Sequence, residues 1–577
     1  MKMKINHIAL VVSVLLIETT AMAQQETRKI TFTGAARAQF FSDHYQSQNE
    51  EDTITVPKLT SGNTLVDLGV VMRPNPQMEI QGMVRVRNDY GGFWGAGVSF
   101  DVRQLYVKGV AGGIVRYQLG DINYKLTPYT LWNTQQELIS NTPFSFQQQT
   151  DVVNYDHFYN NDNSWRQQGA SAEMAFEFGK WIREIEIKTV ATRLKTTDFS
   201  QTNDRIFSGF HFGLVQSEHL RFGFNYVNVF DIYGTSRSMA TFHHPVMTVT
   251  MNYNRKVGSW LHTLEGESGR SNWYYKQEQD DSIPNWQGKF ADAKYKLKHS
   301  DNGLYGSVQI KYVSSDFRSM GAQTKRVNFN GSLSAFQRVG NAQVLRPITM
   351  VDLMRESGLY TTQLQTNLMA FAPQYDNITP YGEATPNRQA AIIKVGFENK
   401  KSPLSASATY YRGQEVRGEG TTTLRGFERY EVDASFNAGR FISADDKDAS
   451  VQIRVRNDRT SRPGTESVPG INLSSRTLTA GLDFEFKKQW HLIGAFQLLT
   501  YKGFELKSIK DFNDEIYNFS ELNLEGSEQL ASAGFKYSFS DKAFLSVQYY
   551  KFFNNNNELD EALFTDKQWM LLYQINF

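Results

Sequence analysis

The last thirteen residues, 565–577, constrain the fold more than any other stretch of the chain. Their side chains alternate in character with a period of two, which is the period of a β-strand. One face is wholly apolar and aromatic, and it consists of Trp569, Leu571, Tyr573, Ile575 and Phe577. The other face is mostly amide, and it consists of Gln568, Met570, Leu572, Gln574 and Asn576. A strand with one face suited to lipid and one suited to water predicts a membrane β-barrel with a wet interior.

The chain ends on an aromatic residue, Phe577, and no polar residue follows it. Such an end is unusual because chain termini are normally loose and solvated. Together with the alternating apolar residues before it, this end resembles the C-terminal signal of Gram-negative outer-membrane β-barrel proteins of the porin-like type. The resemblance implies that the chain resides in the cell outer membrane and that the barrel assembly machinery recognises the apolar face of the terminal strand during biogenesis. It points to no particular subfamily.

The first 23 residues have the features of a secretory signal peptide. Lys2 and Lys4 precede an apolar run over 8–17, and residues 21–23 form a small-x-small cleavage site. The run is too short to cross a bilayer, and no Cys follows the cleavage site, which excludes lipoprotein processing. We therefore expect residues 1–23 to be removed and residues 24–577 to form one outer-membrane β-barrel. The absence of Cys from the sequence suits a barrel closed by strand pairing in an oxidising compartment.

Composition is compatible with a barrel and gives no sign of a nucleic-acid partner. The mean hydropathy of −0.48 is low because only alternate strand residues of a barrel face lipid. Aromatic residues make up 13% of the chain, as aromatic girdles at the two membrane interfaces require. Removal of Lys2, Lys4 and Glu18 with the signal peptide brings the formal net charge from +1 to zero. A balanced charge offers no electrostatic attraction for nucleic acid.

The same two-faced unit recurs along the chain from Ile30 onward; in residues 77–87, for example, apolar side chains alternate with Gln, Glu and Arg. Short polar turns and longer loops join the units alternately, as in barrels with short periplasmic turns and long extracellular loops. The sequence thus predicts an all-β protein, a single transmembrane antiparallel up-and-down β-barrel. Its strand number is predicted to be even, about 18–24 with a best count of about 22. The early start of the alternation argues against a TonB-dependent transporter, which has a globular plug before its first strand.

The polar faces of the predicted strands supply a charged interior. The candidate lumen-lining residues are Arg37, Arg85, Arg87, Asp101, Arg103, Arg454, Arg456, Asp483 and Glu485. These side chains could form a charged constriction that orients or filters polar solutes. They could equally form an ion-paired network that fills and stiffens the lumen, since charges shielded from water need partners. The sequence leaves both interpretations open.

The longest predicted connections are 123–169, 315–387 and 503–530. Loop 123–169 is the most unusual because it combines many Asn and Gln residues with aromatic side chains that could stack on sugar rings. The aromatic candidates in it are Tyr129, Trp132, Phe144, Phe146, Tyr155 and Trp165. A loop of this length is usually either functional or disordered, and its aromatic content argues against disorder. It is expected either to fold into the lumen as a constriction or plug, or to pack on the rim or on a partner protein.

These patterns favour a porin-like channel for small polar solutes. The alternative is a non-conducting barrel subunit of a larger outer-membrane assembly for secretion, protein insertion or surface attachment. The expected partners are outer-membrane lipid, the barrel assembly machinery, and either other outer-membrane proteins or further copies of this chain. We find no defensible grouping of Ser, His and Asp for a hydrolase. The clustered acids Asp280 and Asp281, and Asp445, Asp446 and Asp448, could bind calcium, but such clusters are more often solvated turns. We therefore expect no enzyme activity, cofactor or metal.

Overall fold

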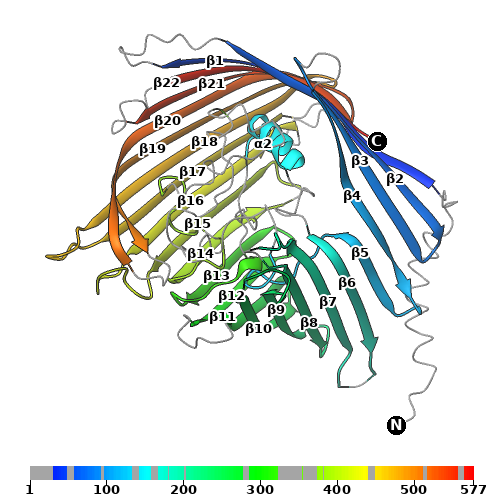
Figure 1. The fold of residues 1–577 in the computed structure, drawn as a ribbon. Helices are drawn as coiled ribbons and strands as arrows, with labels where there is room; N and C mark the ends of the chain where they lie inside the picture. Colours follow the sequence, from blue (N-terminus) through cyan, green and yellow to red (C-terminus); the bar gives the residue numbers. More distant parts are fainter. Residues whose placement is uncertain are drawn as a thin grey trace.

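The computed structural model describes residues 30–47, 58–91, 97–132, 142–157, 167–179, 181–200, 203–238, 240–276, 285–322, 354, 373–380, 382–399, 401–439, 449–510, 516–556 and 564–577. The predicted signal peptide, 1–23, lies outside the described residues. The described chain forms one 22-stranded antiparallel sheet that closes on itself as a barrel (Figure 1).

The first eleven strands are β1 (Ile30–Ser47), β2 (Leu59–Asn75), β3 (Met78–Asp89), β4 (Val98–Ala111), β5 (Val115–Ile122), β6 (Gln167–Glu177), β7 (Glu184–Lys195), β8 (Arg205–Val215), β9 (Leu220–Asp231), β10 (Thr241–Val257) and β11 (Trp260–Lys276). The second eleven are β12 (Asn285–His299), β13 (Leu304–Val313), β14 (Arg388–Glu398), β15 (Leu404–Gln414), β16 (Gly426–Asn437), β17 (Ala449–Arg462), β18 (Ile471–Lys487), β19 (Trp490–Lys510), β20 (Ile516–Ser540), β21 (Ala543–Asn556) and β22 (Phe564–Asn576). This is the predicted all-β, up-and-down architecture with the best-count strand number, and both predictions are confirmed.

The terminal strand closes the barrel. Strand β22 pairs antiparallel with β21 on one side and with β1 on the other. Just beyond the ladder, Phe577 and Gly34 exchange two backbone hydrogen bonds of 2.9 and 3.0 Å. Because both ends of the sheet pair with each other, the barrel leaves no row of unpaired backbone groups at a sheet edge.

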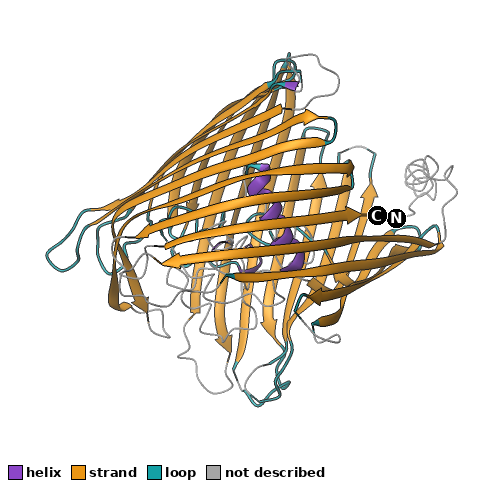
Figure 2. Ribbon diagram, turned by 90° about the horizontal axis from the view of Figure 1, so that it is seen from above, coloured by secondary structure: helices purple, strands orange, loops and turns teal. Residues whose placement is uncertain are grey.

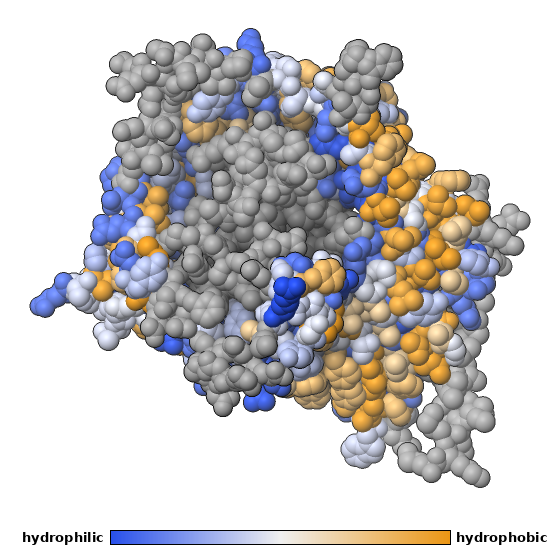
Figure 3. Space-filling model, viewed as in Figure 1, coloured by the Kyte–Doolittle hydropathy of each residue, from blue (hydrophilic) through white to orange (hydrophobic). Residues whose placement is uncertain are grey.

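The two faces of the wall differ as the alternation predicts. Among the outward-facing residues, Phe100 of β4 is 72% exposed and Trp569 of β22 is 56% exposed. Figure 3 shows apolar side chains gathered over the outside of the wall near β2–β4. The inward-facing Gln568 of β22 and Gln548 of β21 are polar, and they are 1% and 0% exposed under the segments folded inside the barrel. An apolar outer surface around a polar inner one is the arrangement of a barrel that lies in lipid.

Short turns join the strands at one end of the barrel, apart from connection 438–448, and the long connections lie at the other end. The predicted long connection 503–530 is wrong, because β19 continues to Lys510 and β20 begins at Ile516 as a long paired hairpin. Strand pairing that extends beyond the lipid needs no apolar outer face. The two-faced signal used to recognise strands is therefore absent from this hairpin.

Within the described residues, two short helical elements lie inside the ring of strands. They are the α-helix α2 (Phe144–His157) and the 3-10 helix η1 (Met320–Ala322). Figures 1 and 2 both show α2 surrounded by the strands. None of the helices in the described part of the chain has the length and apolarity needed to cross a membrane. The buried apolar core of this protein therefore lies between the inner wall and the segments folded against it.

Candidate functional site

Helix α2 follows the inside of the wall and connects two distant parts of it (Figure 2). At its N-terminal end, Pro143 packs on Gly481 of β18, where an added Cβ atom would overlap the proline ring. At its C-terminal end the helix reaches the inner faces of β1 and β3. A helix of 14 residues is about 21 Å long at 1.5 Å per residue. It therefore crosses the inner side of the strands in between, including the seam where the barrel closes.

The middle of α2 is held by an apolar contact with the wall. Phe146, which is fully buried, and Val152 project into one apolar cluster. The other members of that cluster are Phe41, Met354, Ala495, Leu530, Tyr550, Phe552, Phe564, Met570 and Leu572. Met570 and Leu572 are the two apolar residues on the otherwise amide face of the terminal strand. Their position under the helix explains why that face is not polar throughout.

Side-chain hydrogen bonds fix the helix beside this apolar contact. Ser145 Oγ lies 2.6 Å from Ser532 Oγ of β20 and donates to Gln548 Oε1 of β21 at 2.5 Å. One turn further along, Gln149 Nε2 donates to Gln568 Oε1 of β22 at 2.9 Å. Polar groups of the inner wall are thus paired with the helix, as buried polar groups generally must be paired.

The C-terminal end of α2 inserts a carboxylate among four arginines of the wall. We call Arg37, Arg85, Arg87 and Arg103 the arginine cluster. Arg37 Nη2 donates to both carboxylate oxygens of Asp156 at 2.6 Å, and Arg87 Nη1 lies 3.5 Å from Oδ2. Arg85 Nη1 lies 3.9 Å from Oδ1 and also donates to the Asp156 main-chain carbonyl at 3.2 Å. The Asp156 side chain is 1% exposed, so these charges meet where water screens them little.

The residue before it, Tyr155, adds an aromatic contact to the same cluster. The Arg103 guanidinium carbon lies 4.0 Å from the Tyr155 ring centroid, and that of Arg85 lies 5.2 Å from it. The Tyr155 hydroxyl donates to a carboxylate oxygen of Asp67, which also accepts two 2.8 Å bonds from Arg85. Burial raises the pKa of Tyr155 to about 12, and the adjacent Asp67 raises it too. The tyrosine therefore stays a neutral hydrogen-bond donor at ordinary pH.

Strand register explains why residues far apart in sequence meet here. Arg37 of β1 lies opposite Leu65 of β2, which lies opposite Arg87 of β3. Two residues further along these strands, on the same face of the wall, Asp67 of β2 lies opposite Arg85 of β3, and Arg85 lies opposite Asp101 of β4. Arg103 joins them because a register shift in the pairing of β3 with β4 lies beside it. Asp101 faces Arg85 across the ladder, but its own side chain is exposed.

A second inward segment packs on the opposite part of the wall. Tyr129 stacks on Phe290 of β12 with ring centroids 3.9 Å apart, and Phe317 meets Phe290 edge-on at 4.9 Å. We call these three residues the aromatic stack. Gly288 lies directly under Phe317, and a Cβ atom there would overlap the Phe317 backbone. The Tyr129 hydroxyl donates to Asp292 at 2.7 Å, and burial raises the pKa of Tyr129 well above its ordinary value.

A third inward segment, 373–380, is bound to the wall on β16–β19. Arg456 donates to the main-chain carbonyl of Tyr375 at 2.9 Å, and Arg429 donates to Asp376 at 2.9 Å. Asn377 donates to Glu505 of β19 at 2.6 Å. Three separate parts of the wall thus each hold inward-folded pieces of the long connections.

The structure groups some of the sequence-predicted residues and separates others. Arg37, Arg85, Arg87 and Arg103 form one cluster, whereas Arg454 pairs with Glu431 at 2.8 Å on another part of the wall. Arg456 contacts the third segment. Asp483 pairs with His491 at 2.8 Å, and Glu485 accepts the main-chain N–H of Gln489 at 2.7 Å, both close to a short turn. The candidate lumen charges therefore belong to several sites.

The aromatic candidates of loop 123–169 are also distributed. Tyr129 and Phe146 are buried inside the barrel, and Tyr155 is half-buried there. Trp132 and Phe144 are half-buried; Trp132 donates its main-chain N–H to Gly321 at 2.7 Å. Trp165 lies outside the described residues.

Sequence reasoning missed the two carboxylates that organise the arginine cluster, Asp67 and Asp156. A signal for Asp67 was present, because it lies between the apolar Val66 and Leu68 and therefore faces the lumen in a strand. Asp156 has no comparable signal, since residues 144–157 carry no apolar stripe of helical period.

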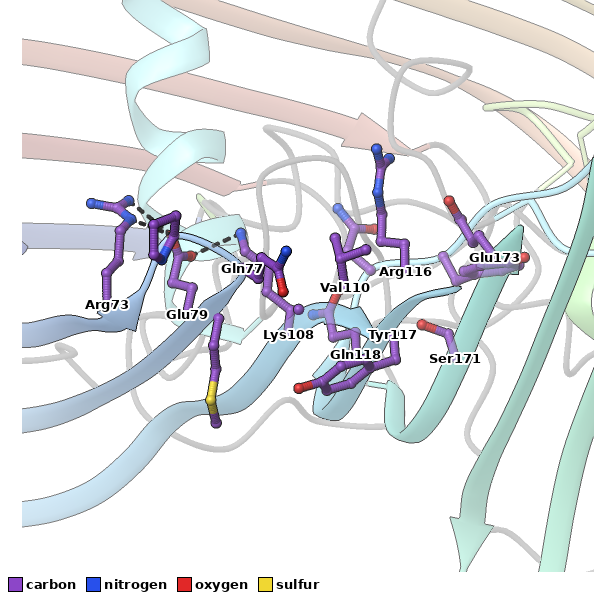
Figure 4. Close-up of a pocket in the computed structure, with 15 residues that line it drawn as sticks. Arg73, Gln77, Glu79, Lys108, Val110, Arg116, Tyr117, Gln118, Ser171 and Glu173 are labelled. Carbon is purple, nitrogen blue, oxygen red and sulfur yellow. Dashed lines mark hydrogen bonds and ion pairs between the residues drawn. The ribbon is translucent and has the colours of Figure 1, made fainter. Parts of the chain in front are cut away.

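A polar cavity of about 400 Å³ opens at the end of the barrel where the short turns lie (Figure 4). Glu79 forms ion pairs with Arg73 and with Lys108, each at 2.8 Å. Arg116 and Glu173 are register partners on β5 and β6 and line another part of it. Across the described ranges, no group of three His, Asp or Glu side chains is placed to hold a metal ion.

Comparisons with known proteins find likeness only among solved structures, since no family model and no curated protein matches the chain. The P pilus usher (PapC) translocation pore has 8% identity and a TM-score of 0.39, with 95% of this chain and 100% of that chain covered. OpdQ of Pseudomonas aeruginosa has 7% identity and a TM-score of 0.36, with 95% and 98% covered. A BenF-like porin from Pseudomonas fluorescens Pf-5 has 7% identity and a TM-score of 0.31, with 95% and 99% covered. Similarity at this level assigns neither a family nor a function to the chain.

Proposed function

We propose that this protein is an outer-membrane channel that passes small polar solutes through a lumen narrowed by inward-folded segments. The observation that carries the proposal is the arrangement of α2 and the aromatic stack on opposite parts of the wall. Helix α2 is bound to β1, β3 and β18–β22, whereas the aromatic stack is bound to β12 and its neighbours. A path between the two would be bounded by both, as a constriction requires.

The two sides of this path carry different charged groups: four arginines with carboxylates among them on one side, and carboxyl groups bound by hydroxyl groups on the other. The arginine cluster lies on the side of β1–β4. On the other side, Thr127 donates to Glu267 of β11 at 2.6 Å. Asp292 of β12 is the register partner of Glu267 and accepts the hydrogen bond from Tyr129. Lumen charges of opposite sign produce a transverse field that orients dipolar solutes and separates ions. Such a field supports a channel that selects polar solutes rather than a nonselective pore.

The proposal is tested by single-channel conductance of the purified, folded barrel in a planar bilayer. We expect stable current steps from the intact protein and larger steps when residues 133–166, which include α2, are replaced by a short turn. Silence from the intact protein with large steps from the replaced one would mean that the segment is a plug. Silence from both would overturn the channel proposal. The folding control is gel electrophoresis: a folded barrel migrates differently before and after heating, so unheated samples of both proteins must differ in mobility from heated ones.

The competing role as a subunit of a larger assembly makes a different prediction for extraction in mild detergent. A channel of this kind should purify alone or as copies of itself. Stoichiometric companion proteins, combined with silence in the bilayer, would favour the assembly subunit.

A further inference from the structure

We propose that the arginine cluster, with the neighbouring amides of Gln39 and Asn63, is a binding site for hydroxylated carboxylate solutes such as sugar acids, and that Asp156 occupies it as an internal ligand that the solute displaces. The inference rests on the proposed channel, because it names the class of solute that the constriction selects.

Asp156 is held in the manner of a bound ligand. It belongs to the inward helix and not to the wall, yet its carboxylate is enclosed by guanidinium groups from β1 and β3. Guanidinium groups suit carboxylates because several N–H donors can meet both oxygens. Here Arg37 Nη2 lies 2.6 Å from each oxygen, and nitrogens of Arg87 and Arg85 approach the same carboxylate at 3.5 and 3.9 Å.

The wall alone leaves one of these arginines without a counter-charge. Asp67 neutralises Arg85 through two 2.8 Å bonds, and Asp89, whose side chain is 47% exposed, pairs with Arg87 at 2.9 Å. Among the described residues, Arg37 has an ion pair only with Asp156. A buried cation without a partner is strongly unfavourable. The site therefore requires an anion, and an external carboxylate would serve as well as that of Asp156.

Beside the arginines, the site has buried hydrogen-bonding groups that are unused. Gln39 and Asn63 lie opposite each other on β1 and β2, one step along the wall from Arg37, and are 1% and 2% exposed. Both amide atoms of Gln39, the carbonyl oxygen of Asn63 and Nε of Arg37 have no hydrogen-bond partner within the described part of the chain. Buried polar groups are normally paired.

These unused groups define the part of the ligand next to the carboxylate. They offer acceptors and donors together, so they fit hydroxyl groups, which can both donate and accept. A carboxylate carried on a hydroxyl-bearing frame would satisfy Arg37 and the two amides at once. Asp156 supplies the carboxylate but not the hydroxyl groups, which gives the solute an advantage over the internal ligand.

Displacement needs to move only the last turn of the helix. The rest of α2 is held separately through Ser145, Phe146 and Gln149. Because the internal ligand competes, the measured affinity for a solute equals the intrinsic affinity multiplied by the fraction of molecules in which Asp156 has left the site.

The test is isothermal titration of the full-length, detergent-folded protein with D-glucuronate, using D-glucose as the uncharged match and acetate as the bare carboxylate. We expect glucuronate to bind more tightly than either. Asp156→Asn should increase glucuronate affinity about tenfold or more by removing the competitor. Adding Arg37→Met to Asp156→Asn should abolish that gain. Asp231→Asn is the matched control, since Asp231 pairs with Arg205 at 2.7 Å elsewhere in the wall, and its affinity should equal that of the unmodified protein.

Unchanged or weaker glucuronate binding by folded Asp156→Asn would overturn the internal-ligand proposal. Glucose or acetate binding as tightly as glucuronate would overturn the proposed solute class. Bilayer conductance of the same preparations separates this inference from the channel itself. A protein that conducts but binds no glucuronate refutes only the inference, whereas one that binds glucuronate without conducting refutes the channel.

Discussion

Two of the three inward segments, α2 and the one that carries Tyr129, are fastened to the wall by different physical means. The aromatic stack joins Tyr129, Phe290 and Phe317 through ring contacts between largely buried side chains. The C-terminal end of α2, by contrast, is held through Asp156 in the arginine cluster. Ring packing is insensitive to solutes, because no ion competes for it. A carboxylate among arginines can be exchanged for another carboxylate, so the two contacts suit a fixed and an adjustable side of one constriction.

Phe290→Ala should have the largest effect on stability, because it removes the ring on which the other two pack. Deleting a buried Phe side chain costs about 3–5 kcal/mol in the free energy of unfolding. Denaturant unfolding of the folded barrel in detergent measures it. Tyr129→Phe is the matched control: it keeps the ring but loses the bond to Asp292, and should cost about 1 kcal/mol. Equal costs for the two variants would show that ring packing is not what holds this segment.

Arg37→Met should have the next largest effect, because it removes the closest partner of a buried carboxylate. Breaking a buried pair costs about 3–5 kcal/mol, and we expect about 2–3 kcal/mol here because Arg85 and Arg87 remain near Asp156. Combining it with Asp156→Leu should cost less than the sum of the two single variants, since neither partner is then left uncompensated. If the costs of the two single variants simply added in the double variant, Arg37 and Asp156 would not interact and could not hold the helix end.

A disulfide between Ser145→Cys and Ser532→Cys sharpens the comparison by locking the other end of α2. The two hydroxyl oxygens are 2.6 Å apart, so the Cβ atoms lie within reach of a disulfide, and the natural sequence contains no competing Cys. We expect Arg37→Met to enlarge the single-channel current and the increase to persist when the disulfide is oxidised, because release of Asp156 moves only the last turn of the helix. Reduction supplies the control in the same protein. An oxidised variant whose current returns to that of the natural protein would mean that the whole helix moves.

The wall of this protein could be predicted from the sequence far better than its contents. A period of two is a local property, and lipid on one side of the wall imposes it on nearly every strand. The hairpin around 503–530 escaped prediction because part of it needs no lipid-facing side chains. The packing glycines, Gly288 and Gly481, resemble any other strand glycine until the segment above each one is known.

The arginine cluster was predicted only in part from the sequence, because its assembly also depends on more than local alternation. Alternation in β1, β3 and β4 predicted that its four arginines face inward. It could not predict that they meet, because the register between strands and the bulge beside Arg103 are set by the whole sheet. Helix α2 was not predicted at all, since its polar sequence acquires a helical conformation through contacts with the wall rather than through an apolar stripe of its own.

The smallest expected effect concerns Asp151, a carboxyl on α2 that is exposed toward the lumen. Its enclosure by the barrel raises its pKa to about 6. The folded protein therefore holds this proton more tightly than the unfolded chain does, and the resulting stability is complete below about pH 4 and is lost as pH rises to about 6. Because the side chain is exposed, we expect this loss of unfolding free energy to be less than about 1 kcal/mol.

Asp151→Asn should remove the pH dependence. Relative to this variant, the natural protein should lose unfolding free energy between about pH 4 and 6, and the difference should then stay constant. A pH-independent difference would show that the carboxyl titrates in the folded barrel as it does in the unfolded chain, and a shift of opposite sign would mean that a positive charge of the wall stabilises it.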